Sequence, residues 1–536
     1  MANMVYKALS KTLGIIIVVA VVVIALVSYI FILPISTQPQ YSKTLIFATT
    51  IEPTSLDIQQ VTWATIIHSL LFQPLVTIDS NMNIVPDLSD HWEISSDGTE
   101  ITFHIPENAK FSNGDPITAQ AIKKSIERYI EISPYSDDYS DLAEIEVINN
   151  NTLKLVFNNP VPYIWPVLVS SYGAPVNAYV AEKIGNEAFG REAVGSGPYK
   201  VKEWVEGSHV VLVRNENYKT NIPFIQNKGP SQYIDEIIVR FIPEDLTRVT
   251  ELEAGHVNIV LDVPLDMVDR LGGNPNIKLY GTISPGVYYL MLNLKNEKLS
   301  DLKVRQAIMI GINRTELALA LGNKILPWYS LLSPTQFCYN STLAKKYEEV
   351  YAYNPEKAKQ LLREAGWVDT NGDGVVDKEG VPLKITLLSA VDDVAMKKVV
   401  PLIQAQLKKI GIDVEIREFT FGYIRALSRN WDFEIAFHRM SWMDPDILIY
   451  RLHSKIGNFT YANPEVDRLL ELGRVISDET ERAKVYSKVQ EIVLEDLPFL
   501  PIFVLKNYIG VNKNVEGLIV HPNGNIFLND ARVKQG

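Results

Sequence analysis

Strand-like and helix-like segments alternate along nearly the whole of this 536-residue chain. Runs rich in Val, Ile, Tyr and Phe predict strands at residues 44–49, 100–105, 152–157, 209–214, 234–241, 383–389 and 413–419. Apolar residues at helical spacing predict helices at residues 118–130, 303–321, 355–365, 392–409, 464–471 and 479–494. Because helices that alternate with strands cover the faces of a sheet, we expect α/β lobes rather than a β-sandwich or a helix bundle.

Composition limits the classes of partner. A chain of this length has room for two or three domains. Its 63 acidic and 51 basic residues give a net charge of −12, so nothing attracts it at long range to nucleic acid or to anionic lipid. Its one cysteine, Cys338, excludes an internal disulfide and a cysteine-rich metal site.

A charge-free apolar run occupies residues 14–33 and has the ~20 residues that a helix needs to cross a bilayer. Lys7 and Lys11 precede it, which predicts a cytoplasmic N-terminus (residues 1–13), a single transmembrane helix and a folded part outside the cell membrane. The run is longer than the apolar region of a cleaved secretory signal, and no cleavage site of that kind follows it. We therefore expect an uncleaved anchor, followed by a short spacer at residues 34–43.

An alternative for the N-terminus stays open. The segment KALS at residues 7–10 resembles the pilin-type signals of some archaeal binding proteins. Such signals are cut before the hydrophobic helix, which here means after Ala8.

Several segments spread over residues 44–530 together resemble one family, the extracellular solute-binding proteins of oligopeptide, dipeptide and nickel uptake systems. Each segment alone is a modest pattern, but their order and separations are specific. They are VPDLSDHWEISSDG (85–98), AKFSNGDPITA (109–119), GSGPYKVKEW (195–204), RNENY (214–218), LEAGHVN (252–258), VRQAIMIGINR (304–314) and NPEKAKQLLREAGW (354–367). In the third segment we interpret Gly195 and Gly197 as residues that allow unusual backbone angles at a bend before a strand.

The resemblance implies a periplasmic-binding-protein-like fold that encloses its ligand between two lobes. Lobe I would comprise residues 44–285 and 504–536, with a subdomain at 81–190, and lobe II would comprise residues 293–500. Apolar strands at 286–293 and 498–505 would cross between them and allow hinge closure around the ligand. The implied function is the substrate-binding component of an ABC importer, with the permease subunits and the membrane as partners.

Enzymatic motifs are missing from the sequence. The eight histidines are scattered and no pair has HExxH spacing, and there is no phosphate-binding P-loop and no G-x-S-x-G elbow. We expect a binding protein that requires no cofactor, and an extracellular hydrolase is the distant alternative. Nickel is not expected as the ligand, because nothing in the sequence gathers several histidines.

The resemblance also suggests where the ligand binds. Peptide-binding relatives use an acidic residue for the ligand's α-amino group, in a region that resembles residues 438–448. Here the interval after Trp442 is shorter than in relatives, so Asp444 corresponds to their later Asp-Pro pair and the amine-binding acid is missing. Asp444 is then either a ligand contact or a residue that caps the turn before Pro445.

Aromatic residues complete the predicted ligand site. Trp63 lies where relatives run along the cleft wall, and Tyr288 and Tyr289 lie on the first crossing strand. Alternation along a strand points these tyrosines in opposite directions, so we expect one of them to face the cleft. A stacking aromatic such as Trp442 also suits a sugar ring, which leaves oligosaccharide as the alternative to a peptide ligand.

A separate segment at residues 369–380 copies the start of a calcium loop. Asp369, Asn371 and Asp373 occupy positions 1, 3 and 5, the carbonyl of Val375 stands at 7 and Asp377 at 9. The pattern departs at position 12, where Gly380 replaces the bidentate glutamate. The sequence predicts a weak structural Ca²⁺ site, with a metal-free polar turn as the alternative.

Overall fold

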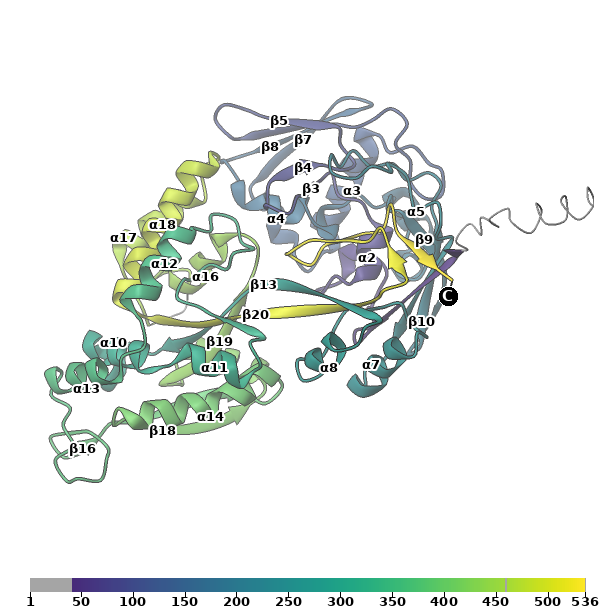
Figure 1. Ribbon diagram of the computed structural model, residues 1–536. Coiled ribbons are helices and arrows are strands. Elements are labelled where there is room, and N and C mark those ends of the chain that lie inside the picture. Colours follow the sequence, from purple (N-terminus) through teal and green to yellow (C-terminus); the bar gives the residue numbers. More distant parts are fainter. Residues whose placement is uncertain (1–40, 458–459, 536) are drawn as a thin grey trace, which may run out of the picture.

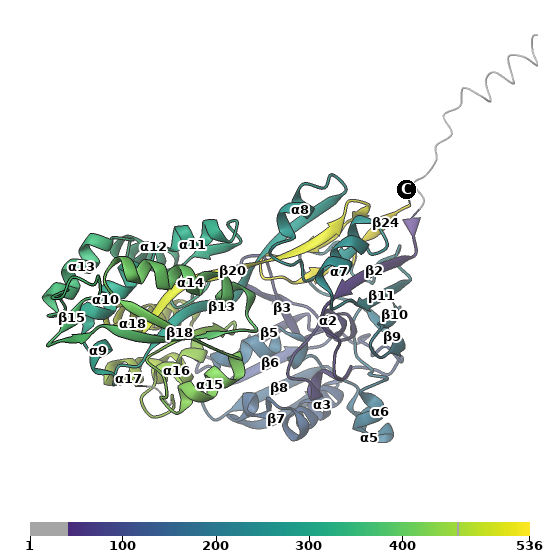
Figure 2. The ribbon, with the colours of Figure 1, turned by 90° about the horizontal axis from the view of Figure 1, so that it is seen from below.

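The computed structural model describes residues 41–457 and 460–535. Figure 1 shows two lobes, with strands β13 (Ile277–Leu292) and β20 (Phe499–Asn512) running from one into the other. Figure 2 shows the same two bodies from below. The two-lobed α/β architecture expected from the sequence is therefore present.

One eleven-stranded sheet passes through both lobes. Its path is β18 (Asp413–Phe419), β17 (Lys384–Ala390), β19 (Ile435–Ser441), β13, β20, β12 (Ile259–Val260), β2 (Thr44–Thr49), β11 (Glu236–Phe241), β10 (His209–Arg214) and β9 (Tyr199–Val205), with β14 (Ile325–Pro327) beside β20. Strands β11 and β12 are each parallel to β2, and β18 and β19 are each parallel to β17. Each lobe thus has its own set of parallel strands, and the antiparallel pair β13–β20 joins the two sets.

The ladder between β13 and β20 is interrupted midway. Ile283 pairs with Lys506 and Val287 with Val504, so residues 284–286 face residue 505 alone. The excess residues form a bulge, and Pro285 within it has no backbone N–H to give to a ladder. The ladder between the two crossing strands is therefore broken where one lobe meets the other.

The predicted subdomain contains an antiparallel sheet with the order β5 (His91–Ile94), β6 (Glu100–His104), β8 (Thr152–Phe157) and β7 (Leu142–Asn149). Helix α3 (Ala119–Ile132) packs against β7 and β8. The expected Thr118 cap is confirmed, because its hydroxyl accepts a hydrogen bond from the Ala121 amide at 3.2 Å.

Separate apolar cores lie within these bodies. One draws its buried side chains from residues 288–503, a second from 45–259 and 509–533, and a third from 75–169. We propose that the lobe boundaries follow the first two cores, with lobe I at 44–285 and 504–536 and lobe II at 293–500. The third core differs at both ends from the predicted subdomain at 81–190, because Leu75 packs in it whereas Phe189 packs in the second core.

One predicted helix is wrong. The single helix expected over residues 303–321 is two helices, α10 (Leu302–Gly311) and α11 (Arg314–Ala320). Ile312 between them is extended, and the Asn313 side chain accepts a hydrogen bond from the Glu316 amide. An asparagine in that geometry begins a new helix rather than continuing the old one.

The glycines before β9 have a different reason from the one expected. Neither Gly195 nor Gly197 has a positive φ. A Cβ at Gly195 would lie 2.2 Å from the Leu71 carbonyl oxygen, and one at Gly197 would lie 2.4 Å from that of Leu70. Glycine is required here because α2 (Ile66–Leu71) approaches the loop too closely for any side chain.

The predicted cytoplasmic residues 1–13 and anchor at 14–33 lie outside the described residues. None of the helices that the structure describes combines the length and the apolarity needed to span a bilayer. The end of the predicted spacer is part of lobe I, because Tyr41 and Ser42 form strand β1, which pairs with β24 (Arg532–Lys534).

Candidate functional site

An open cleft of about 870 Å³ lies where the lobes meet. Lobe I contributes most of its wall, from the start of α2, the loop after β12, strand β20 and residues 523–529. Val394 and Met443 line it from the lobe II side. The volume is within the ~300–1,000 Å³ range of pockets for small ligands.

The parallel strands of lobe I explain why polar groups gather on this wall. Parallel strands end at the same edge of a sheet, and in open α/β sheets ligands bind beyond that edge. Thr49 is the last residue of β2, and Asp262 follows the end of β12. Their side chains meet, with the Thr49 hydroxyl donating to the Asp262 carboxylate at 2.8 Å.

Lobe II reaches the cleft in the same way. Val394 begins α14 (Val394–Lys409) shortly after β17 ends, and Met443 follows the end of β19. Asp393 caps α14 by accepting a hydrogen bond from the Met396 amide at 3.0 Å. The cleft therefore separates two sets of strand ends, and a ligand between them would touch both lobes.

Carboxylates outnumber cations in the cleft wall. The charged residues that line it are Asp87, Asp245, Arg248, Asp262 and Asp266. The Arg248 guanidinium is 1% exposed and donates to the Ile242 and Asp262 carbonyls and to the Asp245 carboxylate. The Arg248 guanidinium is therefore already hydrogen-bonded to other groups of the protein.

The acids of the wall differ in their accessibility. Asp87 is buried, and burial raises its pKa to about 7 although Gln73 and Thr220 donate hydrogen bonds to it. Asp245, Asp262 and Asp266 are exposed, and Asp245 is already paired with Arg248. Asp262 and Asp266 therefore make the accessible wall acidic, which favours a ligand with a positively charged group.

Trp63 is 66% exposed and is not among the residues that line the cleft, although its neighbour Ala64 is. A ligand contact by Trp63 stays a prediction. Sequence patterns did not predict Asp262 and Asp266 as site residues. The available signal was that both acids closely follow the apolar pair Ile259 and Val260. A strand of two residues is too short to be recognised from its pattern.

Tyr288 and Tyr289 do point to opposite faces of β13, but the expectation that one faces the cleft is wrong. Both side chains are 1% exposed. Tyr288 stacks on Phe503 with ring centroids 4.4 Å apart and donates to the Asp393 carboxylate at 2.9 Å, whereas Tyr289 packs against Phe499. Both faces of this end of β13 are buried, so each tyrosine belongs to the core of lobe II.

Asp444 is an internal structural residue. It is fully buried, and each of its carboxylate oxygens accepts a hydrogen bond from Arg482 in α18 (Glu479–Asp496) at 2.7 Å. It also caps the following turn by accepting from the Asp446 amide at 2.8 Å. Burial alone would lower the pKa of Arg482, but the paired carboxylate raises it well above its usual value. Of the two roles weighed for Asp444, the structure shows the cap.

Trp442 is half-buried, and its carbonyl accepts a hydrogen bond from the Gln336 side chain at 2.6 Å. Its neighbour Met443, rather than Trp442 itself, lines the cleft. A ligand contact by Trp442 stays a prediction.

The predicted calcium loop lies at the end of lobe II away from lobe I, beside β15 (Asp377–Lys378) and β16 (Val381–Pro382) (Figure 1). The Asp369 carboxylate accepts hydrogen bonds from the amides of Gly372 and Gly374, and the Asp377 carboxylate accepts from the amide and hydroxyl of Thr370. Asp373 accepts from the Val375 amide, and Asn371 donates to Asp373. Among the described residues, Asp369, Asp373 and Asp377 do not form a group close enough to share one ion, so a cation would have to draw their carboxylates together.

We expect millimolar Ca²⁺ to raise the melting temperature relative to EGTA, because binding to the folded state alone stabilises it by about 1.4 kcal/mol at tenfold excess over Kd. Differential scanning fluorimetry measures the shift. Asp373→Ala should remove the increase and Asp432→Ala, an exposed acid elsewhere in lobe II, should keep it. Identical wild-type curves in Ca²⁺ and EGTA would show that the loop is only a turn.

Comparisons with known proteins agree with this architecture. The model of the bacterial extracellular solute-binding proteins, family 5, matches residues 83–458. The oligopeptide-binding protein AppA of Bacillus subtilis is 27% identical over 516 residues, 91% of each chain. The probable D,D-dipeptide-binding periplasmic protein DdpA of Escherichia coli is 27% identical over 452 residues, 81% of this chain and 82% of its own.

Solved structures share the fold. AppA in complex with a nonapeptide superposes with a TM-score of 0.70 at 24% identity, over 93% of this chain and all of that one. NikA from Brucella suis in complex with Fe(III)-EDTA superposes with a TM-score of 0.80 at 22% identity, over 92% of this chain and all of that one. The family match covers most of the chain and the fold agrees with it. The chain therefore belongs to the bacterial extracellular solute-binding proteins of family 5.

Proposed function

We propose that this protein is the substrate-binding component of an ABC importer and captures oligopeptides or dipeptides in the cleft between its lobes. Family membership supports the transport role, and the names of AppA and DdpA make peptides the first ligand class to test. The permease subunits of the importer would be its partners. A binder of this kind carries out no chemistry on its ligand.

The observation that carries the peptide proposal is the exposed carboxylate of Asp262 in the cleft wall. Its carboxylate accepts hydrogen bonds from the hydroxyls of Thr49 and Thr50 and from the Thr50 amide. The nearby Arg248 guanidinium donates to the backbone carbonyl of Asp262 and not to its carboxylate. A peptide's α-ammonium group would supply the missing charge. An oligosaccharide has no such group and is the second candidate, because the exposed Trp63 next to Ala64 offers a stacking surface.

Mass spectrometry of ligand released from the natively purified protein tests the ligand class. We expect peptides with free amino termini. Sugars in their place would overturn the peptide proposal and leave the transport role standing. Incubation with the identified ligand should return it intact, whereas cleavage would indicate a hydrolase.

We also propose that the folded part lies outside the cell and is tethered by the apolar run at residues 14–33, which the flanking Lys7 and Lys11 support. Protease added to intact cells should then remove the folded part while a cytoplasmic marker stays whole. Complete protection would contradict the proposal, and mass determination of the N-terminus would reveal cleavage after Ala8.

A further inference from the structure

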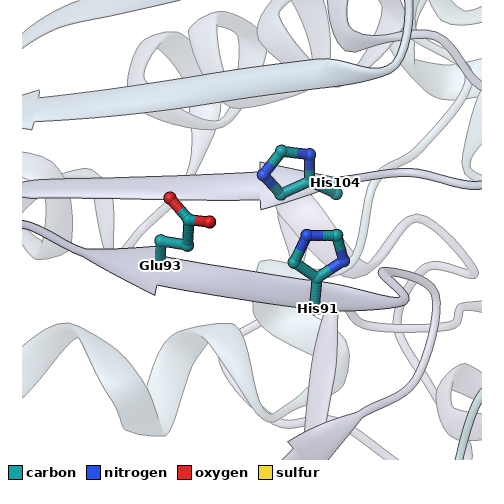
Figure 3. Close-up of side chains that lie close together, drawn as sticks. All are labelled: His91, Glu93 and His104. Carbon is teal, nitrogen blue, oxygen red and sulfur yellow. The ribbon is translucent and has the colours of Figure 1, made fainter.

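Three metal-ligating side chains meet on the subdomain sheet, apart from the cleft (Figure 3). They are His91 and Glu93 on β5 and His104 on β6. His91 pairs directly with His104 across the antiparallel ladder. Side chains two residues apart on a strand share a face, so Glu93 lies on the same side as both histidines. The opposite face carries Phe103, which is buried in the subdomain core.

The ligand atoms of the three residues, one from each, all lie within 4.8 Å of one another. The imidazole rings are stacked, with centroids 4.0 Å apart and planes 5° from parallel. Figure 3 shows a nitrogen of each ring on the side that faces the Glu93 carboxylate. Ligand atoms around Zn²⁺ at 2.0–2.1 Å are about 3.4 Å apart. Because a metal ion lies in the plane of each imidazole that binds it, the two stacked rings must turn until one nitrogen of each points at the same ion.

The surroundings of the His91 ring and of the His104 ring each favour a bound metal ion. The Asp90 carboxylate lies 2.6 Å from Nδ1 of His91, which orients the ring and leaves Nε2 available. A carboxylate on the second nitrogen is the usual support of a metal-binding histidine. Nε2 of His104 is shielded from solvent and has no hydrogen-bond partner among the described residues. A buried polar atom without a partner is costly, and a cation would satisfy it.

We propose that His91, Glu93 and His104 form a site for a divalent transition-metal cation, with Zn²⁺ as the first candidate and Ni²⁺ or Cu²⁺ as competitors. Two imidazole nitrogens and one carboxylate oxygen suit these ions rather than Ca²⁺ or Mg²⁺, which prefer oxygen alone. Water completes the coordination. The bound ion ties β5, at the edge of its sheet, to β6.

Calorimetric titration of ZnCl₂ into the full chain tests the site. The protein is purified in detergent with an affinity tag that contains no histidine, stripped with EDTA and dialysed. We expect one high-affinity site, with affinity at least tenfold weaker in His104→Gln. Asp90→Asn should weaken it about 10–100-fold, because loss of a supporting carboxylate has that effect at metal sites.

His256→Gln is the matched control, because His256 is also an exposed histidine with a carboxylate nearby, that of Glu251 at 3.3 Å. It should bind zinc as the wild type does. Circular dichroism verifies folding, and if His104→Gln does not fold, Glu93→Gln at an exposed position replaces it with the same expectation. The proposal is overturned if the wild type takes up no zinc at 100 µM, or if the folded variant binds as tightly as the wild type.

Discussion

Asp444→Ala is expected to lower the free energy of unfolding by about 3–5 kcal/mol. The variant leaves the Arg482 guanidinium, which is 5% exposed, without the carboxylate that holds it at two points. An unpaired charge in such a place costs far more than the pair contributes when intact. Thermal melting or a urea titration followed by tryptophan fluorescence measures the loss.

Two further variants separate charge burial from packing. Asp432→Ala removes an exposed acid of the same lobe and should leave the melting curve within error of the wild type. The double change Asp444→Leu with Arg482→Met should be more stable than Asp444→Ala, because no charge then stays buried without a partner. If Asp444→Ala melts at the same temperature as the wild type but no longer binds ligand, Asp444 is a ligand contact and not a structural residue.

Asp262→Asn is expected to weaken binding of a peptide with a free amino terminus by about 10–100-fold, since a hydrogen bond to a charged group contributes about 1.5–3 kcal/mol. Asparagine keeps an oxygen that can accept from the Thr49 hydroxyl, so the wall keeps its shape while one negative charge is removed. Isothermal titration with a peptide identified from the native protein measures the change.

The N-acetylated form of the same peptide is the matched control. It lacks the ammonium group, so wild type and Asp262→Asn should bind it equally, and the double-mutant cycle isolates the pair. Asp266→Asn tests the second exposed acid of the wall. If Asp262→Asn weakens both forms of the peptide equally, the residue acts on the shape of the cleft and not on the amine.

Local patterns of the sequence predicted several of the longer strands and helices. The segment 44–49 is β2, 152–157 is β8 and 413–419 is β18, with unchanged bounds. Such strands were recognisable because alternation and β-branched residues act over a few neighbours. The break between α10 and α11 at Asn313 was not predicted, because an asparagine that caps a new helix and one that only interrupts a helical pattern look the same in the sequence.

The burial of single side chains was predicted less well. Tyr288 and Tyr289 sit on a crossing strand, and alternation correctly put them on opposite faces. Whether a face meets ligand or core depends on what covers it, and β13 is covered on both sides at this end. The burial of Asp444 could not be predicted from its neighbours in sequence either, because its partner Arg482 lies 38 residues further along the chain.

The sequence by itself determined the class of the molecule: the order of strands and helices, the family and the two-lobed plan all depend on short-range patterns and on motifs in a fixed order. Tertiary structure alone decided which residues meet. Asp262 reaches Thr49 because β2 and β12 are parallel neighbours, and His91 reaches His104 because a hairpin pairs their strands in one register. Contacts of this kind depend on sheet order and register, which no local stretch of sequence specifies.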